Sequence, residues 1–175
     1  MSDHRQIFLH GALGQRQLNE VLGSLMAGLI LYPEEIWLVS AWITDFVLLN
    51  NSTGNWDSLT PSWGCRDVMF SEVLVLAVNS GCKLNIVVND KQINRRFINN
   101  LSKQIGDKEN YRCEISAPLH TKGLLSQSFF LRGSMNFTYS GTNKNDEHVT
   151  LTTHADTISE ARIEFEGHYF NGSSI

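Results

Sequence analysis

Five polar residues in the C-terminal half of the chain have the types and the spacing needed for chemistry on a phosphate diester. They are His120, Lys122, Ser134, Asn136 and Glu147. His120 and Lys122 lie two residues apart, as do Ser134 and Asn136, and side chains two apart on a strand point to the same face. An imidazole, a fixed cation, a hydroxyl and an amide that converge on one volume would supply a group that works near neutral pH and partners for charged phosphate oxygens.

The order of these residues resembles the signature of the phospholipase D superfamily, in which a His-x-Lys block precedes a Gly-Ser-x-Asn block and a Glu. The resemblance is carried by residues 120–122, residues 133–136 and Glu147. Within the superfamily, these residues and their neighbours look closest to phospholipase D-like proteins of bacterial DNA-modification and phage-defence clusters, in particular the deazaguanine-in-DNA (Dpd) system. Gln127 departs from the pattern, since the family's first block normally carries an Asp there, and the gap between the blocks is slightly short.

The chemistry expected of such a site is a metal-independent phosphodiester cleavage. No His, Cys or carboxylate cluster in the sequence has convincing metal-ligand spacing, so we expect no metal and no cofactor. His120 would attack phosphorus and form a phosphohistidine, which water would then hydrolyse. Lys122 would supply positive charge, and Asn136 would donate a hydrogen bond to a non-bridging oxygen. Ser134 would hydrogen-bond nearby or to the phosphate itself, and Glu147 would hold the His120 imidazole through its second nitrogen.

One histidine cannot easily act both as the nucleophile and as the acid that protonates the leaving oxygen. Members of the superfamily with two motifs use one histidine from each half, and this chain has one His-x-Lys block. The resemblance therefore implies a C2 homodimer in which two copies of His120 face each other across the axis.

The composition is that of a folded domain, and we expect residues 1–175 to form one domain. Hydrophobic residues make up 42% of the 175 and charged residues 18%. The net charge of −4 gives no general attraction to nucleic acid, so a DNA-binding enzyme would need a local basic groove. Candidate groove residues are Arg66, Arg95, Arg96, Arg132 and Lys144, of which Arg132 and Lys144 lie nearest the motif.

Three cysteines without metal-ligand spacing and a first segment without a signal-peptide pattern predict reduced thiols in a cytoplasm. The most apolar stretch, residues 21–32, is too short to cross a bilayer, so we expect no membrane partner.

Hydrophobic periodicity predicts helices over residues 15–31, 67–78, 94–105 and 157–169. It predicts strands over residues 36–43, 84–88, 113–115, 121–125, 128–132 and 149–152. Alternating strands and helices followed by a hairpin indicate an α/β fold with a mixed central sheet flanked by helices on both faces, which is also the sandwich that the resemblance implies.

Four tryptophans divide into two pairs by their surroundings. Trp37 and Trp42 lie in the apolar run 36–43 and are predicted to be core residues. Trp56 and Trp63 lie in a polar loop over residues 50–64, where they either pin the loop to the body, which we favour, or stack on bases.

Three functions compete at this point. The first is a DNA endonuclease of a prokaryotic modification or defence system, acting alone or assembled with other proteins of that system, and this setting is what the resemblance implies. The second is a lipid phosphodiesterase or transferase, for which the sequence offers no obvious amphipathic membrane helix. The third is a non-catalytic subunit that binds phosphate or DNA, which the replacement of the family's Asp by Gln127 would allow.

Overall fold

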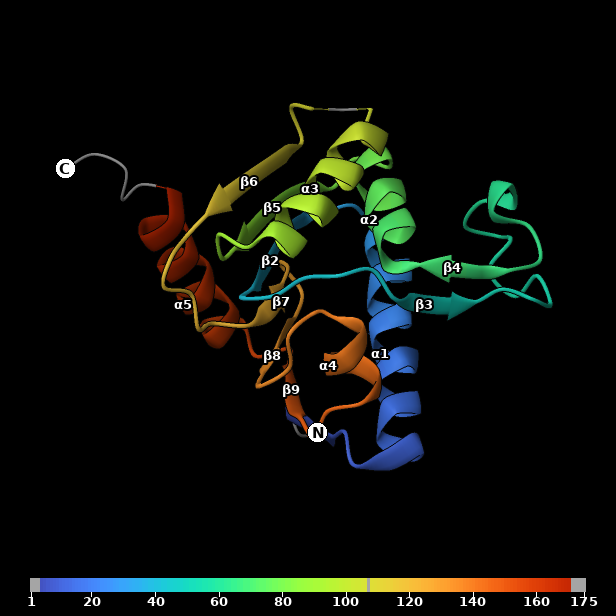
Figure 1. Cartoon of the computed structure of the whole chain (residues 1–175), viewed down its shortest axis with the longest axis horizontal. Coiled ribbons are helices and arrows are strands. Elements are labelled where there is room, and N and C mark those ends of the chain that lie inside the picture. Colours follow the sequence, from blue (N-terminus) through green and yellow to red (C-terminus); the bar gives the residue numbers. More distant parts are fainter. Residues whose placement is uncertain (1–3, 107, 171–175) are drawn as a thin grey trace.

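The computed structural model describes residues 4–106 and 108–170. Its centre is a seven-stranded sheet with the strand order β1-β9-β8-β7-β2-β5-β6 (Figure 1). The strands are β1 His4–Phe8, β2 Glu35–Ser40, β5 Lys83–Val88, β6 Tyr111–Ile115, β7 Gly123–Leu125, β8 Phe130–Gly133 and β9 His148–Thr152. β2, β5 and β6 run parallel, whereas β7, β8, β9 and β1 pair antiparallel, so the predicted mixed sheet is confirmed.

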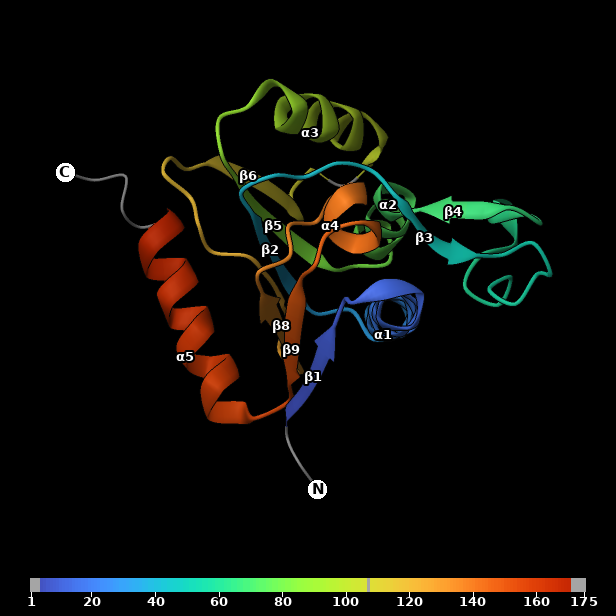
Figure 2. The same ribbon diagram turned by 60° about the horizontal axis from the view of Figure 1, so that its bottom comes forward.

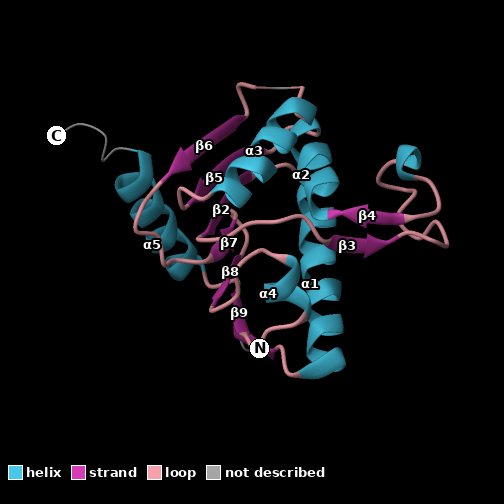
Figure 3. Ribbon diagram, in the orientation of Figure 1, coloured by secondary structure: helices cyan, strands magenta, loops and turns pink. Residues whose placement is uncertain are grey.

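Helices cover both faces of this sheet, as predicted (Figures 2 and 3). They are α1 Gly11–Leu31, α2 Phe70–Asn79, α3 Gln92–Gln104, α4 Tyr139–Asn143 and α5 Ala155–Phe165, the last continued by a π-helical turn over Glu166–Phe170. The larger buried cluster joins α1, α2 and α3 to one face of the sheet, and a smaller one joins α5 to the other face.

The two central strands explain why both faces need cover. Almost every residue of β2 and β5 is buried, as expected of parallel strands between two helical layers. Their side chains alternate between layers: Leu38 and Ile86 belong to the cluster under α1, whereas Trp37 packs in the cluster under α5.

A second, two-stranded sheet projects beside α1 and α2 (Figure 1). It pairs β3 Val47–Asn50 with β4 Asp67–Met69. Neither strand is predicted from the sequence, and the helix expected from residue 67 begins only at Phe70 because the three residues before it pair with β3.

The loop between β3 and β4 is organised by the buried side chain of Asn51. Its amide donates to Asp57 Oδ1 at 2.9 Å and to the Gly64 carbonyl at 2.7 Å, and its oxygen accepts from the Trp56 backbone N–H at 2.7 Å. Trp63 is only 6% exposed, and Trp56 packs against the core. These two tryptophans therefore pin the loop to the body, which is the reading the sequence favoured.

The prediction for Trp42 is wrong. The strand predicted over residues 36–43 ends at Ser40, and beyond it only Ile43 makes an isolated bridge, to Phe137. The side chain of Trp42 is 43% exposed, because the chain turns away from the sheet before reaching it.

Within the described residues, no helix is long and apolar enough to cross a bilayer.

Candidate active site

All five motif residues lie at one edge of the main sheet, and strand direction explains why. The register pairs Val39, near the end of β2, with Gly123 at the start of β7. It then pairs Gly123 with Arg132, and Gly133 with Val149 near the start of β9. The ends of β2 and β8 and the starts of β7 and β9 therefore meet at the same edge, together with the end of the parallel strand β5.

His120 and Lys122 stand in an extended segment just before β7, not within the strand that the sequence predicts from residue 121. The segment is anchored by Asn89, whose Oδ1 accepts from the Leu119 N–H at 2.9 Å. The Lys122 ammonium donates to the His120 carbonyl at 2.7 Å, which holds the two residues together. The His120 ring is exposed, and it has no hydrogen-bond partner within the described ranges.

A cleft of about 510 Å3 opens beside these two residues, between the sheet and α5. We call it the histidine cleft; it is lined by His120, Thr121, Lys122, Phe130, Arg132, Gly133, His148, Thr150, Ala161, Glu164 and Phe165. Two fixed cations and two imidazoles thus face one carboxylate, that of Glu164. Such a balance of charge favours an anionic ligand, even though the chain as a whole is acidic.

Ser134 and Glu147 form a pair next to this cleft. The Ser134 hydroxyl donates to Glu147 Oε2 and accepts from the His148 backbone N–H at 3.1 Å. The other carboxylate oxygen, Oε1, accepts from the Asn145 amide at 3.3 Å. Ser134 is therefore engaged as both donor and acceptor, and it is not a free nucleophile.

The hydrogen bond expected between Glu147 and the His120 ring is not among those of the described part of the chain. The register supplies the reason: Gly133 pairs with Val149, which brings the residue after Gly133 close to Glu147. Gly133 itself is required there, because a Cβ atom at this position would lie 2.1 Å from the His148 carbonyl oxygen. The close approach of β8 and β9 thus commits the carboxylate to Ser134.

Asn136 lies on the other side of the Ser134–Glu147 pair. Its Oδ1 accepts from the Trp42 backbone N–H at 3.2 Å, which fixes the side chain against the loop after β2. That loop also receives the next residue, since the Phe137 N–H donates to the Ser40 hydroxyl at 3.0 Å. The amide nitrogen of Asn136 remains available to donate to a phosphate oxygen.

A second cleft of about 460 Å3 opens at Asn136. We call it the aromatic cleft; it is lined by Trp42, Thr44, Ile93, Asn136, Thr138, Tyr139, Ser140 and Asn145. The histidine cleft holds Gly133 and His148, and the aromatic cleft holds Asn136 and Asn145. The turn after β8 and the segment before β9 therefore line both clefts, and the Ser134–Glu147 pair lies between the residues that line one cleft and those that line the other.

Three of the five candidate groove residues lie in three different places. Arg132 lines the histidine cleft, and the Lys144 ammonium lies 5.1 Å from the centre of the Tyr139 ring, at the aromatic cleft. Arg66 lines neither cleft. Its guanidinium instead makes two hydrogen bonds to Glu72, at 2.6 and 2.9 Å, and these hold the pKa of that carboxyl below its ordinary value.

Gln127, at the position of the family's Asp, is remote from these groups. It lies in the turn between β7 and β8, at the end of the hairpin opposite His120. Its backbone N–H donates to Glu34 Oε2 at 2.9 Å, and the same oxygen accepts from the Ser128 N–H at 3.1 Å. A carboxylate from another segment therefore supports this turn.

Sequence reasoning assigned no role to His148, whose ring lines the histidine cleft. The sequence contains one signal for this position of His148. Adjacent side chains on an extended chain point to opposite faces, so when the Glu147 carboxylate points to Ser134, the His148 side chain points to the other face. Within the described ranges, no three His, Cys, Asp or Glu side chains gather in an arrangement that could hold a metal ion, and the three cysteines are free thiols.

Comparison with known proteins adds a family and a set of folds. The sequence pattern of the family described as "Cardiolipin synthase, PLD-like domain" matches residues 46–169. NucT from Helicobacter pylori is similar with a TM-score of 0.64 and 15% identity, over 94% of each chain. Nuc from Salmonella typhimurium, a phospholipase D family member, is similar with a TM-score of 0.62 and 15% identity, over 96% of this chain and 93% of that one.

A polyphosphate kinase from Porphyromonas gingivalis is similar with a TM-score of 0.60 and 16% identity, over 93% of this chain but only 25% of the kinase. At these identities the structural likeness establishes the fold alone. No curated protein matches the chain in sequence.

Proposed function

This chain belongs to the phospholipase D-like family, and on that premise we propose that it is a phosphodiesterase that cleaves DNA through a phosphohistidine intermediate. The observation that carries the proposal is the joint lining of one cleft by His120, Lys122 and Arg132. The similar structures include two proteins named Nuc and NucT, which agrees with a nuclease.

The proposed reaction has two steps. Neutral His120 attacks phosphorus, the N–P bond forms, and the P–O bond to the leaving oxygen breaks while that oxygen takes a proton from an acid. Water then attacks phosphorus, the N–P bond breaks, and the proton of the water returns to the group that served as the acid. Lys122 and Arg132 offset the charge of the non-bridging oxygens, and Asn136 donates a hydrogen bond to one of them.

We assign the acid to His120 of a second subunit related by a twofold axis. Two observations support this assignment: the His120 ring is exposed, and within the described residues it has no hydrogen-bond partner. A second copy would supply both the missing imidazole and a second Lys122. The chemistry needs no metal ion, because the protein cations carry the electrostatic role.

The biological setting that we propose is a bacterial DNA-modification or phage-defence system, in the cytoplasm and in company with other proteins of that system. This part of the proposal is supported by the likeness of the two sequence blocks to the Dpd proteins and by nothing in the geometry. The test is to tag proteins encoded by genes next to the gene for this chain and to ask whether this chain co-purifies with them.

The test of the reaction is cleavage of labelled DNA in excess EDTA by the wild-type chain and by two histidine variants. His120→Ala should lose cleavage by at least about a thousandfold, since it removes the nucleophile. His168→Ala is the matched control, because that imidazole is exposed and lines neither cleft. Circular dichroism should show the same fold for all three proteins.

A second measurement separates an enzyme from a binding subunit. Rapid quench of wild-type protein in alkaline detergent, with a DNA substrate labelled at the phosphate, should trap an adduct at His120 that is stable in base and labile in acid. DNA binding without any adduct would instead identify a phosphate-binding subunit, and loss of cleavage in EDTA would refute the metal-free mechanism. Vesicles of phosphatidylcholine should remain intact; their hydrolysis would favour a lipid phosphodiesterase.

A further inference from the structure

Two exposed aromatic rings face the aromatic cleft beside Asn136. Trp42 is 43% exposed and Tyr139 is 51% exposed, although large aromatic side chains usually gain stability by burial. Each ring has a lysine near its face: the Lys91 ammonium lies 5.8 Å from the Trp42 ring centre, and that of Lys144 lies 5.1 Å from the Tyr139 ring centre. The cleft thus combines aromatic surface with positive charge.

The backbone under both rings is held firmly. The Trp42 N–H donates to Asn136 Oδ1, and the Trp42 carbonyl accepts from the Ser40 hydroxyl at 2.6 Å. The Tyr139 N–H donates to the Thr44 hydroxyl at 3.1 Å. Rings that are exposed on an anchored backbone lose little conformational freedom when a ligand stacks on them, so they form a platform prepared for binding.

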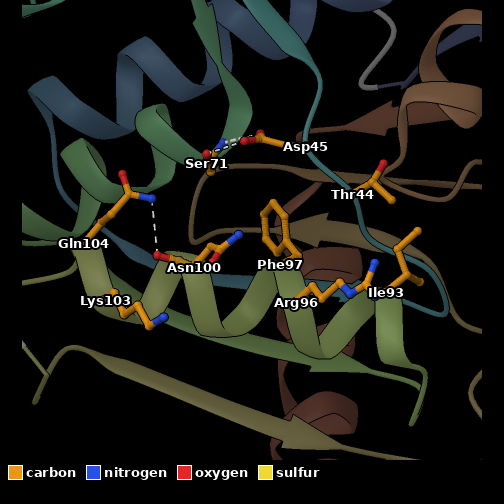
Figure 4. A pocket seen from close by; sticks show the side chains of 9 residues that line it. All are labelled: Thr44, Asp45, Ser71, Ile93, Arg96, Phe97, Asn100, Lys103 and Gln104. Carbon is orange, nitrogen blue, oxygen red and sulfur yellow. Dashed lines mark hydrogen bonds between the residues drawn. The ribbon is translucent and has the colours of Figure 1, made fainter.

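A further cleft of about 560 Å3 continues from this platform along α3, and we call it the α3 cleft. Thr44 and Ile93 line both clefts, so the two are contiguous. Figure 4 shows Arg96 beside Ile93 and Thr44, and Lys103 farther along the same helix. At 1.5 Å per residue, the two cations stand about 10 Å apart along the helix axis.

The cations of the α3 cleft are available to an external anion. Arg96 and Lys103 make no ion pair within residues 4–106 and 108–170, whereas the adjacent Arg95 pairs with Asp90 at 2.7 Å. The carboxylate in this cleft, Asp45, is occupied by Ser71, whose N–H and hydroxyl donate to it at 3.0 and 2.6 Å (Figure 4). Two cations against one hydrogen-bonded carboxylate leave the α3 cleft with a net positive charge, which favours a phosphate.

We propose that the aromatic cleft and the α3 cleft together bind a single DNA strand next to the reacting phosphate. Unpaired bases stack on Trp42 and Tyr139, and the following phosphates pass Arg96 and Lys103. The occupant is a single strand because stacking on a protein ring needs a free base face, which a duplex hides. This inference rests on the proposed function for the nature of the polymer, and it assigns the residues that hold it.

The experiment measures binding, not cleavage, in a His120→Ala background. Fluorescence anisotropy would give the dissociation constant of a labelled oligothymidylate at fixed salt, and of the same strand annealed to its complement. We expect the single strand to bind at least tenfold more tightly than the duplex. Trp42→Ala and Tyr139→Ala should each weaken single-strand binding roughly five- to hundredfold, whereas Trp42→Phe, which keeps a ring, should retain most of the affinity.

Tyr32→Ala is the matched control, because Tyr32 is an exposed tyrosine that lines neither cleft, and its loss should leave binding unchanged. The salt dependence of binding tests the proposed phosphate contacts of Arg96 and Lys103 separately. Replacing both Arg96 and Lys103 by Ala should lower the slope of log affinity against log salt by about 1.4, as expected for two lost contacts on a single strand.

Unchanged binding by both ring variants, or equal loss in Tyr32→Ala, would overturn the inference while leaving the proposed reaction intact. Failure of the proposed reaction gives a different result. If wild-type protein never cleaves DNA but the ring variants lose single-strand binding, the proposed reaction is wrong and the proposed binding site is still supported.

Discussion

The Ser134 hydroxyl donates its hydrogen bond to the Glu147 carboxylate, across the point where β8 and β9 separate. The family pattern implied a different partner for that carboxylate, the His120 imidazole. In the structure this pair joins the turn after β8 to the segment before β9. Glu147 therefore acts first as a positioning residue for the turn that carries Asn136.

Removing the hydroxyl tests this role. We expect Ser134→Ala to lower the free energy of unfolding by about 1–3 kcal/mol, because a half-buried carboxylate loses a donor and the His148 N–H loses its acceptor. Urea denaturation would measure the change. Ser159→Ala, at an exposed site on α5, is the control and should be neutral; equal stability of Ser134→Ala and wild type would show that the bond contributes nothing.

His148 gives a prediction that separates binding from chemistry. Its ring lines the same cleft as His120, so it could either help to hold the phosphate or serve as the acid within one subunit. We expect His148→Ala to raise KM while kcat falls less than about tenfold, the pattern of lost ground-state binding.

Steady-state cleavage by His148→Ala and His120→Ala would decide between the two roles. A loss in His148→Ala as deep as that in His120→Ala would place the acid in the same subunit, and the twofold arrangement would then be unnecessary. Mixing wild-type protein with an excess of His120→Ala protein gives an independent check. A site that needs His120 from both chains makes every mixed dimer inactive, so activity should fall below the wild-type fraction, whereas independent sites would leave it proportional to that fraction.

The sequence predicts the centre of the fold well because the signal there is local. Continuous apolar runs mark β2 and β5, and the helical period marks α1 and α5. β1 gives no such signal: only Ile7 of its five residues is buried, so the strand shows neither a run nor an alternation. The position of such an edge strand is determined by its pairing with the neighbouring strand, here β9.

The two clefts could not be predicted from the sequence, because they depend on contacts between residues far apart in the chain. The exposure of Trp42 follows from a turn that is held by Ser40 and Asn136, and these two lie ninety-six residues apart in the chain. Nothing in an apolar run over residues 36–43 indicates that a distant amide will end the strand at Ser40. Residue types predicted the chemistry of the motif, whereas the division of that motif between two clefts depends on packing between distant loops.

The substitution at Gln127 leads to a third prediction. We expect Gln127→Asp to leave cleavage unchanged, because this turn lies at the end of the hairpin opposite His120. Stability should fall by less than about 1 kcal/mol, since the new carboxylate would stand near that of Glu34. A rise in activity in a DNA cleavage assay would show instead that the family's Asp matters to the chemistry.

Glu34→Ala is the informative partner of that variant. It should cost about 1–3 kcal/mol in urea denaturation, because the turn would lose the acceptor for two backbone N–H groups and the Ser128 hydroxyl. The double variant Glu34→Ala/Gln127→Asp should recover part of the loss if the new Asp can take over the acceptor role.

The Arg66–Glu72 pair predicts how stability depends on pH. The guanidinium hydrogen bonds hold the pKa of Glu72 below its ordinary value of 4.5, so the folded state binds its proton less readily than the unfolded state does. The resulting stabilisation is fully present above pH 4.5 and is lost as the pH falls through the lower, folded-state value.

We expect Arg66→Ala to be destabilising at pH 7, with a difference in the free energy of unfolding from wild type that shrinks steadily below pH 4.5. Urea denaturation over this range would measure it, with Arg95→Ala, from the more exposed pair with Asp90, as the control that should change least. A difference that stays constant down to acid pH would show that Arg66 stabilises the β3–β4 sheet by packing and not through the charge of Glu72.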